Sequence, residues 1–174
     1  MNKKNIEFRD LKADEIDVRV QGVYDGKGVV LLLYKDARVD MNILDETIGN
    51  MNWKKSYSRD NANCVVSIYD EDKKEWIEKE DTGTESFAEK EKGLASDSFK
   101  RSCFAWGIGR ELYTAPFIWV NWEDLQVVGE EGKRKIKDTF IVEKIKIEDK
   151  KIVLLSIKNN RGKRVFTWSD LKDE

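Results

Sequence analysis

The sequence predicts an α+β fold: a β-hairpin and a three-stranded antiparallel sheet packed by a long helix, followed by a small C-terminal β module. Alternating apolar and polar residues between turn-forming residues indicate the strands. Apolar residues three or four positions apart indicate the helices. The 174 residues contain six Trp, five Tyr and seven Phe, which is enough apolar material for a folded core.

The N-terminal third is predicted to form a hairpin and a helix. Residues 14–20 form a short helix or an extended segment, and residues 23–34 form the hairpin, with its turn at residues 25–28. A helix is then predicted from Asp36, a suitable N-cap, to Gly49, a suitable left-handed C-terminal cap. Its apolar positions recur at helical spacing: Ala37, Met41, Leu44 and Ile48. We expect this helix to pack on a sheet.

The middle of the chain is predicted to be an antiparallel meander followed by a long helix. Residues 53–59, 63–70 and 75–82 form the strands, and residues 86–106 form the helix. Steps of 100° per residue divide this helix into two faces. The predicted core face carries Ala88, Ala95, Phe99, Ser102 and Trp106. The opposite face carries Lys90, Asp97, Lys100, Arg101 and Phe104.

The C-terminal part is predicted to be a three-stranded β module with strands at residues 139–147, 152–158 and 164–168. We therefore expect two domains, residues 1–120 and residues 121–174. Residues 133–164 hold twelve basic and four acidic residues, although the whole chain has a formal charge of −2. This asymmetry indicates either a polyanion partner or an ordinary basic hairpin facing solvent.

Several classes of function are disfavoured by what the sequence lacks. It has no histidine, no glycine-rich phosphate loop and only two cysteines, Cys64 and Cys103. We therefore expect no cofactor and no enzymatic chemistry, and buried, reduced cysteines in a cytoplasmic protein. The N-terminus has no apolar run that would form a signal peptide or membrane span. Acidic turns at residues 70–72, or Asp81 with Glu85, leave a metal site open as a less favoured alternative.

The long helix carries the most informative charges. Lys100 and Arg101 are adjacent, and Lys90, Phe104 and Arg110 are near them in sequence. Cations beside an aromatic ring suit a single strand of nucleic acid, because cations bind phosphates and rings stack on bases. A solvated helix face is the alternative explanation for the same residues.

Two stretches resemble the Rad fifty-two family of single-strand annealing proteins, in the short form found in bacteriophages and prophages. The more specific stretch is KEDTGTES at residues 79–86 with EKEKGLASDSFKRSCFAWGIGRELY at residues 89–113. The other is LLLYKDARVDMNILDETIGNMNW at residues 31–53. The resemblance runs from about residue 11 to residue 119 and implies an annealing core over this region.

The resemblance implies a DNA-binding groove. Lys100 and Arg101 correspond to the helix pair that grips the backbone of a single strand. Arg19 corresponds to an arginine before the first hairpin, and Tyr34 to a groove tyrosine. Phe104 stands where the family often has a further arginine, so stacking replaces an ionic contact there. Two further basic positions, one to two helical turns earlier, correspond to Lys90 and Lys92.

The family also implies an activity and partners. Its members bind single-stranded DNA and anneal complementary strands without ATP in homologous recombination and repair. They assemble into homo-oligomeric rings or filaments, and a phage exonuclease or a single-strand binding protein is an expected partner. One alternative is a protein that binds nucleic acid or a host protein without annealing. Another is a metal-dependent nuclease that uses carboxylates such as Asp81 or Asp97.

Overall fold

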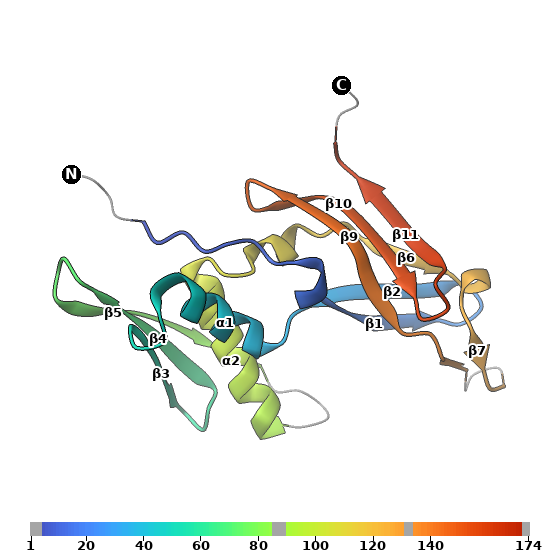
Figure 1. The fold of residues 1–174 in the computed structure, drawn as a ribbon. Coiled ribbons are helices and arrows are strands. Elements are labelled where there is room, and N and C mark those ends of the chain that lie inside the picture. Colours follow the sequence, from blue (N-terminus) through green and yellow to red (C-terminus); the bar gives the residue numbers. More distant parts are fainter. Residues whose placement is uncertain (1–4, 85–89, 131–133, 172–174) are drawn as a thin grey trace. The chain divides into compact units, whose positions relative to one another are not determined.

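The computed structural model describes residues 5–84, 90–130 and 134–171 (Figure 1). It confirms the α+β class, because mostly antiparallel sheets, one of them three-stranded, are combined with two α-helices in the described residues. The helices are α1 (Ala37–Ile48) and α2 (Lys90–Trp106), with three short 3-10 helices, η1 (Ala13–Glu15), η2 (Arg110–Thr114) and η3 (Trp122–Asp124). The strands are β1 (Asp17–Tyr24), β2 (Gly28–Tyr34), β3 (Trp53–Ser58), β4 (Asn63–Asp70), β5 (Glu75–Thr82), β6 (Ile118–Asn121), β7 (Val127–Val128), β8 (Lys135–Ile136), β9 (Phe140–Glu148), β10 (Lys151–Asn159) and β11 (Arg164–Ser169).

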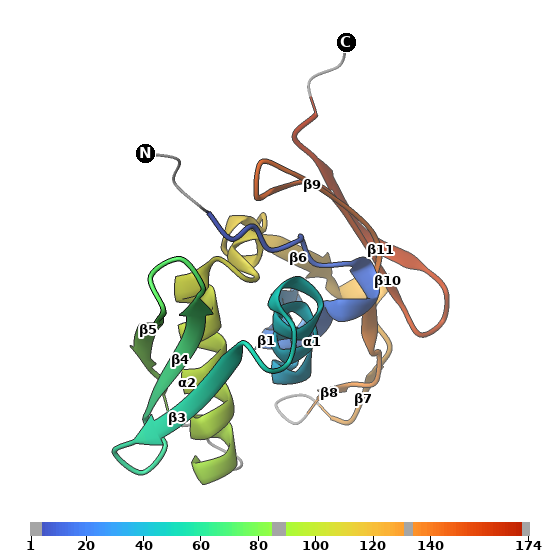
Figure 2. The ribbon, with the colours of Figure 1, turned by 60° about the vertical axis from the view of Figure 1, so that its left-hand side comes forward.

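The chain divides into two compact units, and the first comprises Met1–Arg9 and Ala37–Gly109. Strands β3, β4 and β5 form the predicted antiparallel meander, and α2 packs against β4 and β5. Helix α1 contacts α2 (Figure 2). Burial of one large apolar side chain such as Phe99 stabilises the unit by about 1.5–3 kcal/mol. The core residues are Phe8, Ile43, Leu44, Cys64, Val66, Ile68, Phe99, Cys103 and Ile108.

The second unit comprises Asp10–Asp36 and Arg110–Glu174. Its main sheet has the strand order β11-β10-β9-β1-β2-β6, and β7 pairs with β8 in a small separate ladder. The outermost strands of the main sheet, β11 and β6, also contact each other, so the sheet curls towards closure. One side of the sheet is therefore enclosed. The buried residues of this unit include Val29, Leu31, Leu33, Ile118, Val120, Phe140, Val142, Leu155 and Ile157.

Two glycines of the hairpin have different roles. Gly26 has φ +72°, and the amide of Lys27 donates to the carbonyl of Tyr24 at 2.9 Å, as the predicted turn requires. Gly28 has no positive φ and instead allows a close approach by β6. A Cβ at Gly28 would lie 2.4 Å from the carbonyl oxygen of Val120 and 2.6 Å from the Trp119 ring.

Gly49 confirms the predicted C-terminal cap of α1. It has φ +83°, and its amide donates to the carbonyl of Asp45 at 3.0 Å. Helix α2 ends at Trp106 as predicted, whereas its predicted start at Ser86 lies outside the described residues.

The C-terminal strands differ from the expected separate module. All three predicted strands exist as β9, β10 and β11, but β9 pairs with β1 through Asp17↔Ile141 and Val18↔Phe140. Without a neighbour on this side, β1 would present unpaired backbone groups along its edge. The structure therefore divides the chain by its sheets, and the N-terminal hairpin lies in the same unit as residues 110–174.

The link between β5 and α2 gives a test of packing in the first unit. A Cβ at Gly83 would lie 2.6 Å from the amide nitrogen of Ser98 and 2.9 Å from the carbonyl oxygen of Leu94, both backbone atoms of α2. We expect Gly83→Ala to lower the free energy of unfolding by about 1–3 kcal/mol, because the helix must shift. Gly22→Ala is the control, since the nearest atom there lies at 3.5 Å. Equal urea midpoints for the two variants would contradict this prediction.

Candidate nucleic-acid interface

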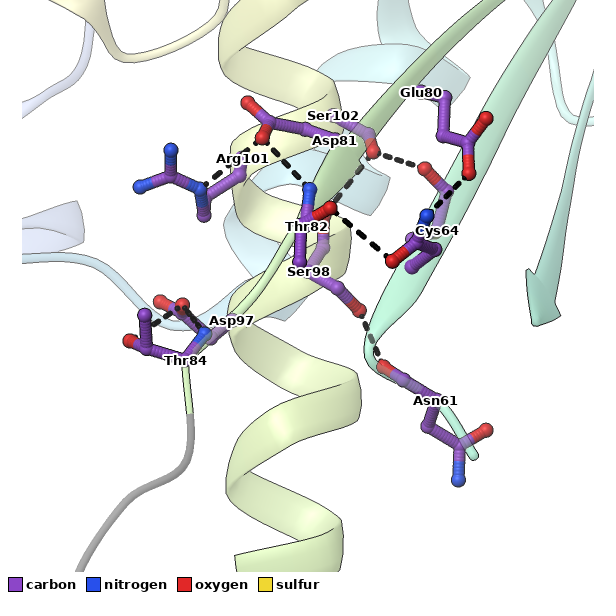
Figure 3. Close-up of polar contacts among 11 residues, drawn as sticks. Asn61, Cys64, Glu80, Asp81, Thr82, Thr84, Asp97, Ser98, Arg101 and Ser102 are labelled. Carbon is purple, nitrogen blue, oxygen red and sulfur yellow. Dashed lines mark hydrogen bonds and ion pairs between the residues drawn. The ribbon is translucent and has the colours of Figure 1, made fainter. Parts of the chain in front are cut away.

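Polar contacts fix the rotation of α2 on the three-stranded sheet. The Ser98 hydroxyl donates to the carbonyl of Asn61 at 3.0 Å, and the Ser102 hydroxyl donates to the carbonyl of Cys64 (Figure 3). The Trp106 indole donates to the carbonyl of Val66 at 2.9 Å. Phe99, fully buried, lies on the same side. The core face predicted from helical spacing is thus confirmed at Phe99 and Ser102, and it determines where Lys100 and Arg101 lie.

Arg101 is bound to β5 through an ion pair. Its Nε lies 3.3 Å from Oδ1 of Asp81, with the two side chains 43% and 31% exposed. The same Asp81 oxygen accepts from the amide of Thr82 at 2.7 Å. In Figure 3 the terminal guanidinium nitrogens point away from Asp81. The carboxylate therefore orients Arg101 and leaves the outer end of the guanidinium accessible.

The helix face opposite the predicted core face is partly occupied by β5 and the chain that follows it. Asp97 accepts from the amide of Thr84 at 2.8 Å, and Asp81 pairs with Arg101 (Figure 3). Asp97 and Arg101, which helical spacing put opposite the core face, therefore both have partners in the chain. The chain after β5 passes close to α2 at Gly83, which 100° steps along one helix cannot reveal.

The other predicted positions on α2 are Lys100, Phe104, Lys90 and Lys92. Lys100 and Phe104 are half-buried and four residues apart, so they share one face of the helix. Lys90 and Lys92 lie in the first turn of α2, and their side chains are outside the described part of the chain.

Two lysines next to α2 were not among the residues predicted from the sequence. Nζ of Lys55 lies 4.4 Å from the centroid of the Phe99 ring, and Nζ of Lys79 lies 4.4 Å from that of Trp106. Lys79 also donates to the carbonyl of Ala105 at 3.0 Å. The period-two alternation of β3 and β5 already put these lysines on the helix side of the sheet. They add positive charge along the edges of α2.

The thiol below α2 is not an activated nucleophile. Burial raises the pKa of Cys64, although Ser102, Lys55 and Tyr57 oppose the shift. Burial also raises the pKa of Tyr57 to about 12, and the neighbouring thiols add to this effect. Cys64 and Cys103 are both buried and neither forms a disulfide. The two cysteines therefore form part of the core.

The second unit holds the remaining predicted residues. Arg19 on β1 and Tyr34 on β2 are both exposed, and Cζ of Arg19 lies 5.5 Å from the centroid of the Tyr34 ring. The structure brings these two together within one sheet, as a cation beside an aromatic face. Arg110, also exposed, begins η2. The first unit holds the other predicted residues, namely Lys90, Lys92, Lys100, Arg101 and Phe104.

The basic C-terminal strands contain an ion-pair cluster around Glu143. Its carboxylate accepts from Arg164 at 2.6 Å and from the Ser156 hydroxyl at 3.1 Å, and Lys158 lies 4.0 Å away. The hydrogen bond from Arg164 is the largest cause that lowers the pKa of Glu143 to about 2. Part of the positive charge predicted for these strands is thus neutralised locally.

The carboxylates considered for a metal site have other partners. Asp81 and Asp97 are engaged as described above, and Asp70 accepts from the amides of Asp72 and Lys73. Glu85 lies outside the described residues. Among the described residues, no group of three or more potential metal ligands is found, and no helix is long and apolar enough to cross a membrane.

The Glu143 cluster makes stability depend on acid pH. Because the pKa of Glu143 is lowered in the folded state, its stabilisation is present above about pH 4.5 and is lost as the pH falls towards 2. We expect Glu143→Gln to melt below wild type at pH 7. The difference between the two melting temperatures should close between pH 4.5 and 2. A difference that stays constant across this window would contradict the assignment.

Comparison with known proteins adds no family. No family model matches the chain, and neither a curated protein nor a solved structure gives a match. The resemblance to the annealing family therefore stands on the motifs quoted above.

Proposed function

We propose that this protein binds single-stranded DNA and anneals complementary strands without ATP, as in phage-type homologous recombination and repair. It would act as a homo-oligomer, a ring or filament in the bacterial cytoplasm, together with a phage exonuclease or a single-strand binding protein. No covalent chemistry and no cofactor are part of this proposal.

The observation that carries the proposal is the position of Lys100 and Arg101 near the end of α2. The packing of Phe99 and Ser102 fixes the helix, and Asp81 holds Arg101 with its terminal nitrogens directed away from the carboxylate (Figure 3). Along the chain, the elements before the end of α2 follow the predicted order of hairpin, helix, three-stranded meander and long helix. A Lys-Arg pair on a rigid helix is suited to neutralise adjacent phosphates.

Annealing needs a grip that does not depend on sequence. Contacts to phosphate and sugar position a strand without reading its bases, and the bases remain available for pairing. Lys100 and Arg101 supply phosphate contacts from the first unit. The resemblance also assigns Arg19 and Tyr34 to strand binding, and within their own unit they place one cation beside one aromatic ring.

Binding at Arg101 would be an exchange of anions. Arg101 forms an ion pair with Asp81, whose side chain is 31% exposed. Such partly exposed ion pairs contribute little net stability in water. A phosphate that approaches the outer nitrogens can therefore displace or share this contact at small cost. Asp81 then serves to keep the guanidinium extended before DNA arrives.

The direct test is the double variant Lys100→Ala with Arg101→Ala. We expect weaker binding to an oligo-dT strand, and a slope of log affinity against log salt that is smaller by about 1.4. Each phosphate contact with a single strand contributes about 0.7 to that slope. Annealing of two labelled complementary oligonucleotides without nucleotide should slow in parallel.

The matched control is Lys73→Ala with Lys74→Ala. These adjacent lysines lie in the β4–β5 turn, 61% and 70% exposed, and their removal changes the net charge equally. Equal loss of binding in both double variants would mean that only net charge matters. Strand binding without faster annealing would favour the second candidate, a nucleic-acid-binding protein that does not anneal.

A further inference from the structure

The main sheet of the second unit has an inner and an outer face that can be followed through its register. Val29 pairs with Val120 and Leu31 with Ile118, and all four are buried on the inner face. The alternate residues therefore lie on the outer face. This face includes strands from both the N-terminal and the C-terminal parts of the sequence, because β1 pairs with β9.

One end of the outer face is an aromatic platform. The Trp119 ring packs directly over Gly28, where a Cβ would lie only 2.6 Å from it. Tyr24 lies against Trp119 with ring centroids 5.5 Å apart, and Phe117 stacks on it at 6.4 Å with an interplanar angle of 17°. Tyr24 is 53% exposed and Phe117 is 72% exposed. Two exposed rings thus contact the half-buried Trp119 ring on one surface.

The other end of the outer face is basic. Five paired residues form one row across five strands, from β2 to β11. In strand order they are Tyr34, Asp17, Ile141, Lys158 and Arg164. Arg19 lies over Tyr34 beside this row. Lys144 on β9 pairs with Ser156 on β10, two residues before Lys158. Cations outnumber carboxylates around this row. The carboxylates are Asp17 and Glu143, and the cations are Arg19, Lys144, Lys158 and Arg164.

We propose that this outer face binds a single strand of nucleic acid, with bases stacked on the platform of Tyr24, Phe117 and Trp119. The cations of β1, β9, β10 and β11 bind its phosphates. This inference deepens the proposed function and rests on it. It assigns to the C-terminal strands a part of the binding surface that the family resemblance does not reach.

The dimensions of the face fit a short run of nucleotides. Gly28, under Trp119, and Tyr34 are six residues apart on β2, which corresponds to roughly 20 Å along a strand. From β1 to β11 the sheet adds three strand spacings of about 4.8 Å. Stacking platforms with a basic track of this size bind several nucleotides of single strand irrespective of sequence.

Charge favours a nucleic acid over an apolar protein partner on this face. The outer face of the three-stranded sheet in the first unit also has an aromatic pair, Tyr69 and Trp76, with Lys54 over the Trp76 ring. That face carries Glu78 and Glu80 beside the aromatic pair, and phosphates would be repelled there. Of these two outer sheet faces, that of the second unit combines exposed rings with an excess of cations among the described residues.

The test compares oligo-dT with an abasic strand of equal length at fixed salt. Wild type should bind oligo-dT more tightly, because an abasic strand has phosphates but no bases to stack. Phe117→Ala and Trp119→Ala should each weaken binding of oligo-dT, Trp119→Ala by about fivefold or more, and leave the abasic strand unchanged. Phe117 is so exposed that its replacement should leave folding intact. Trp76→Ala is the aromatic control, for which no change is expected.

A second variant should change affinity in the opposite direction. Asp17 is exposed in the middle of the basic row, so Asp17→Asn should tighten binding of both strands. Asp14→Asn, an exposed change in η1 with the same charge effect, is the matched control and should have a smaller effect. A misfolded variant would not bind more tightly, so this result cannot come from damage to the fold.

The outcomes separate this inference from the proposed function. If Lys100→Ala with Arg101→Ala abolishes binding while the platform variants bind both strands like wild type, this inference is overturned and the proposed function stands. Equal affinity of wild type for oligo-dT and the abasic strand overturns it as well. If Phe117→Ala instead converts an oligomer to a smaller species in mass photometry, with the preference for bases unchanged, the face is a subunit interface and the inference fails.

Discussion

The short pairing of β1 with β9 is the constraint on which the second unit depends. Only Asp17↔Ile141 and Val18↔Phe140 join the two strands, yet they connect the N-terminal hairpin to the C-terminal strands. Phe140 and Val142 enter the same buried side as Leu33 and Leu31. The pairing also places Arg19 and Tyr34 on one surface with Lys158 and Arg164. A chain whose basic residues are concentrated near its end thereby brings them to its first hairpin.

Local patterns predicted most elements correctly, because turns and alternation are local signals. The hairpin turn at Gly26, the cap at Gly49 and all three C-terminal strands follow from neighbouring residues. The β1–β9 pairing joins segments more than 120 residues apart, and no local feature names the partner of an edge strand. Alternation in β9 predicts that Ile141 and Phe140 face opposite ways, but not that Asp17 lies beside Ile141. For this reason the sequence predicted a separate C-terminal module, whereas β9 pairs with β1.

The site on α2 shows the same division between local and distant information. Helical spacing placed Phe99 and Ser102 in the core correctly, and this fixed the position of Arg101 on the helix. It gave no indication that the chain at Gly83 passes so close that a Cβ would touch the helix backbone. Asp81 and Thr84 consequently occupy part of the face that Arg101 and Asp97 share. Alternation in β3 and β5 predicts that Lys55 and Lys79 face the helix side of the sheet. It does not predict that they lie over aromatic rings of α2.

Pairing of cations with carboxylates explains how a chain of formal charge −2 can suit a polyanion. Arg101 is held by Asp81, and Arg164 by Glu143, so each guanidinium has a fixed orientation. In the proposed function, a phosphate would exchange with a carboxylate, and the net gain per contact would be smaller than for an unpaired cation. Binding assembled from many such exchanges is reversible and sensitive to salt. A protein that must hold a strand long enough to find its complement, and then release the duplex, benefits from contacts of this strength.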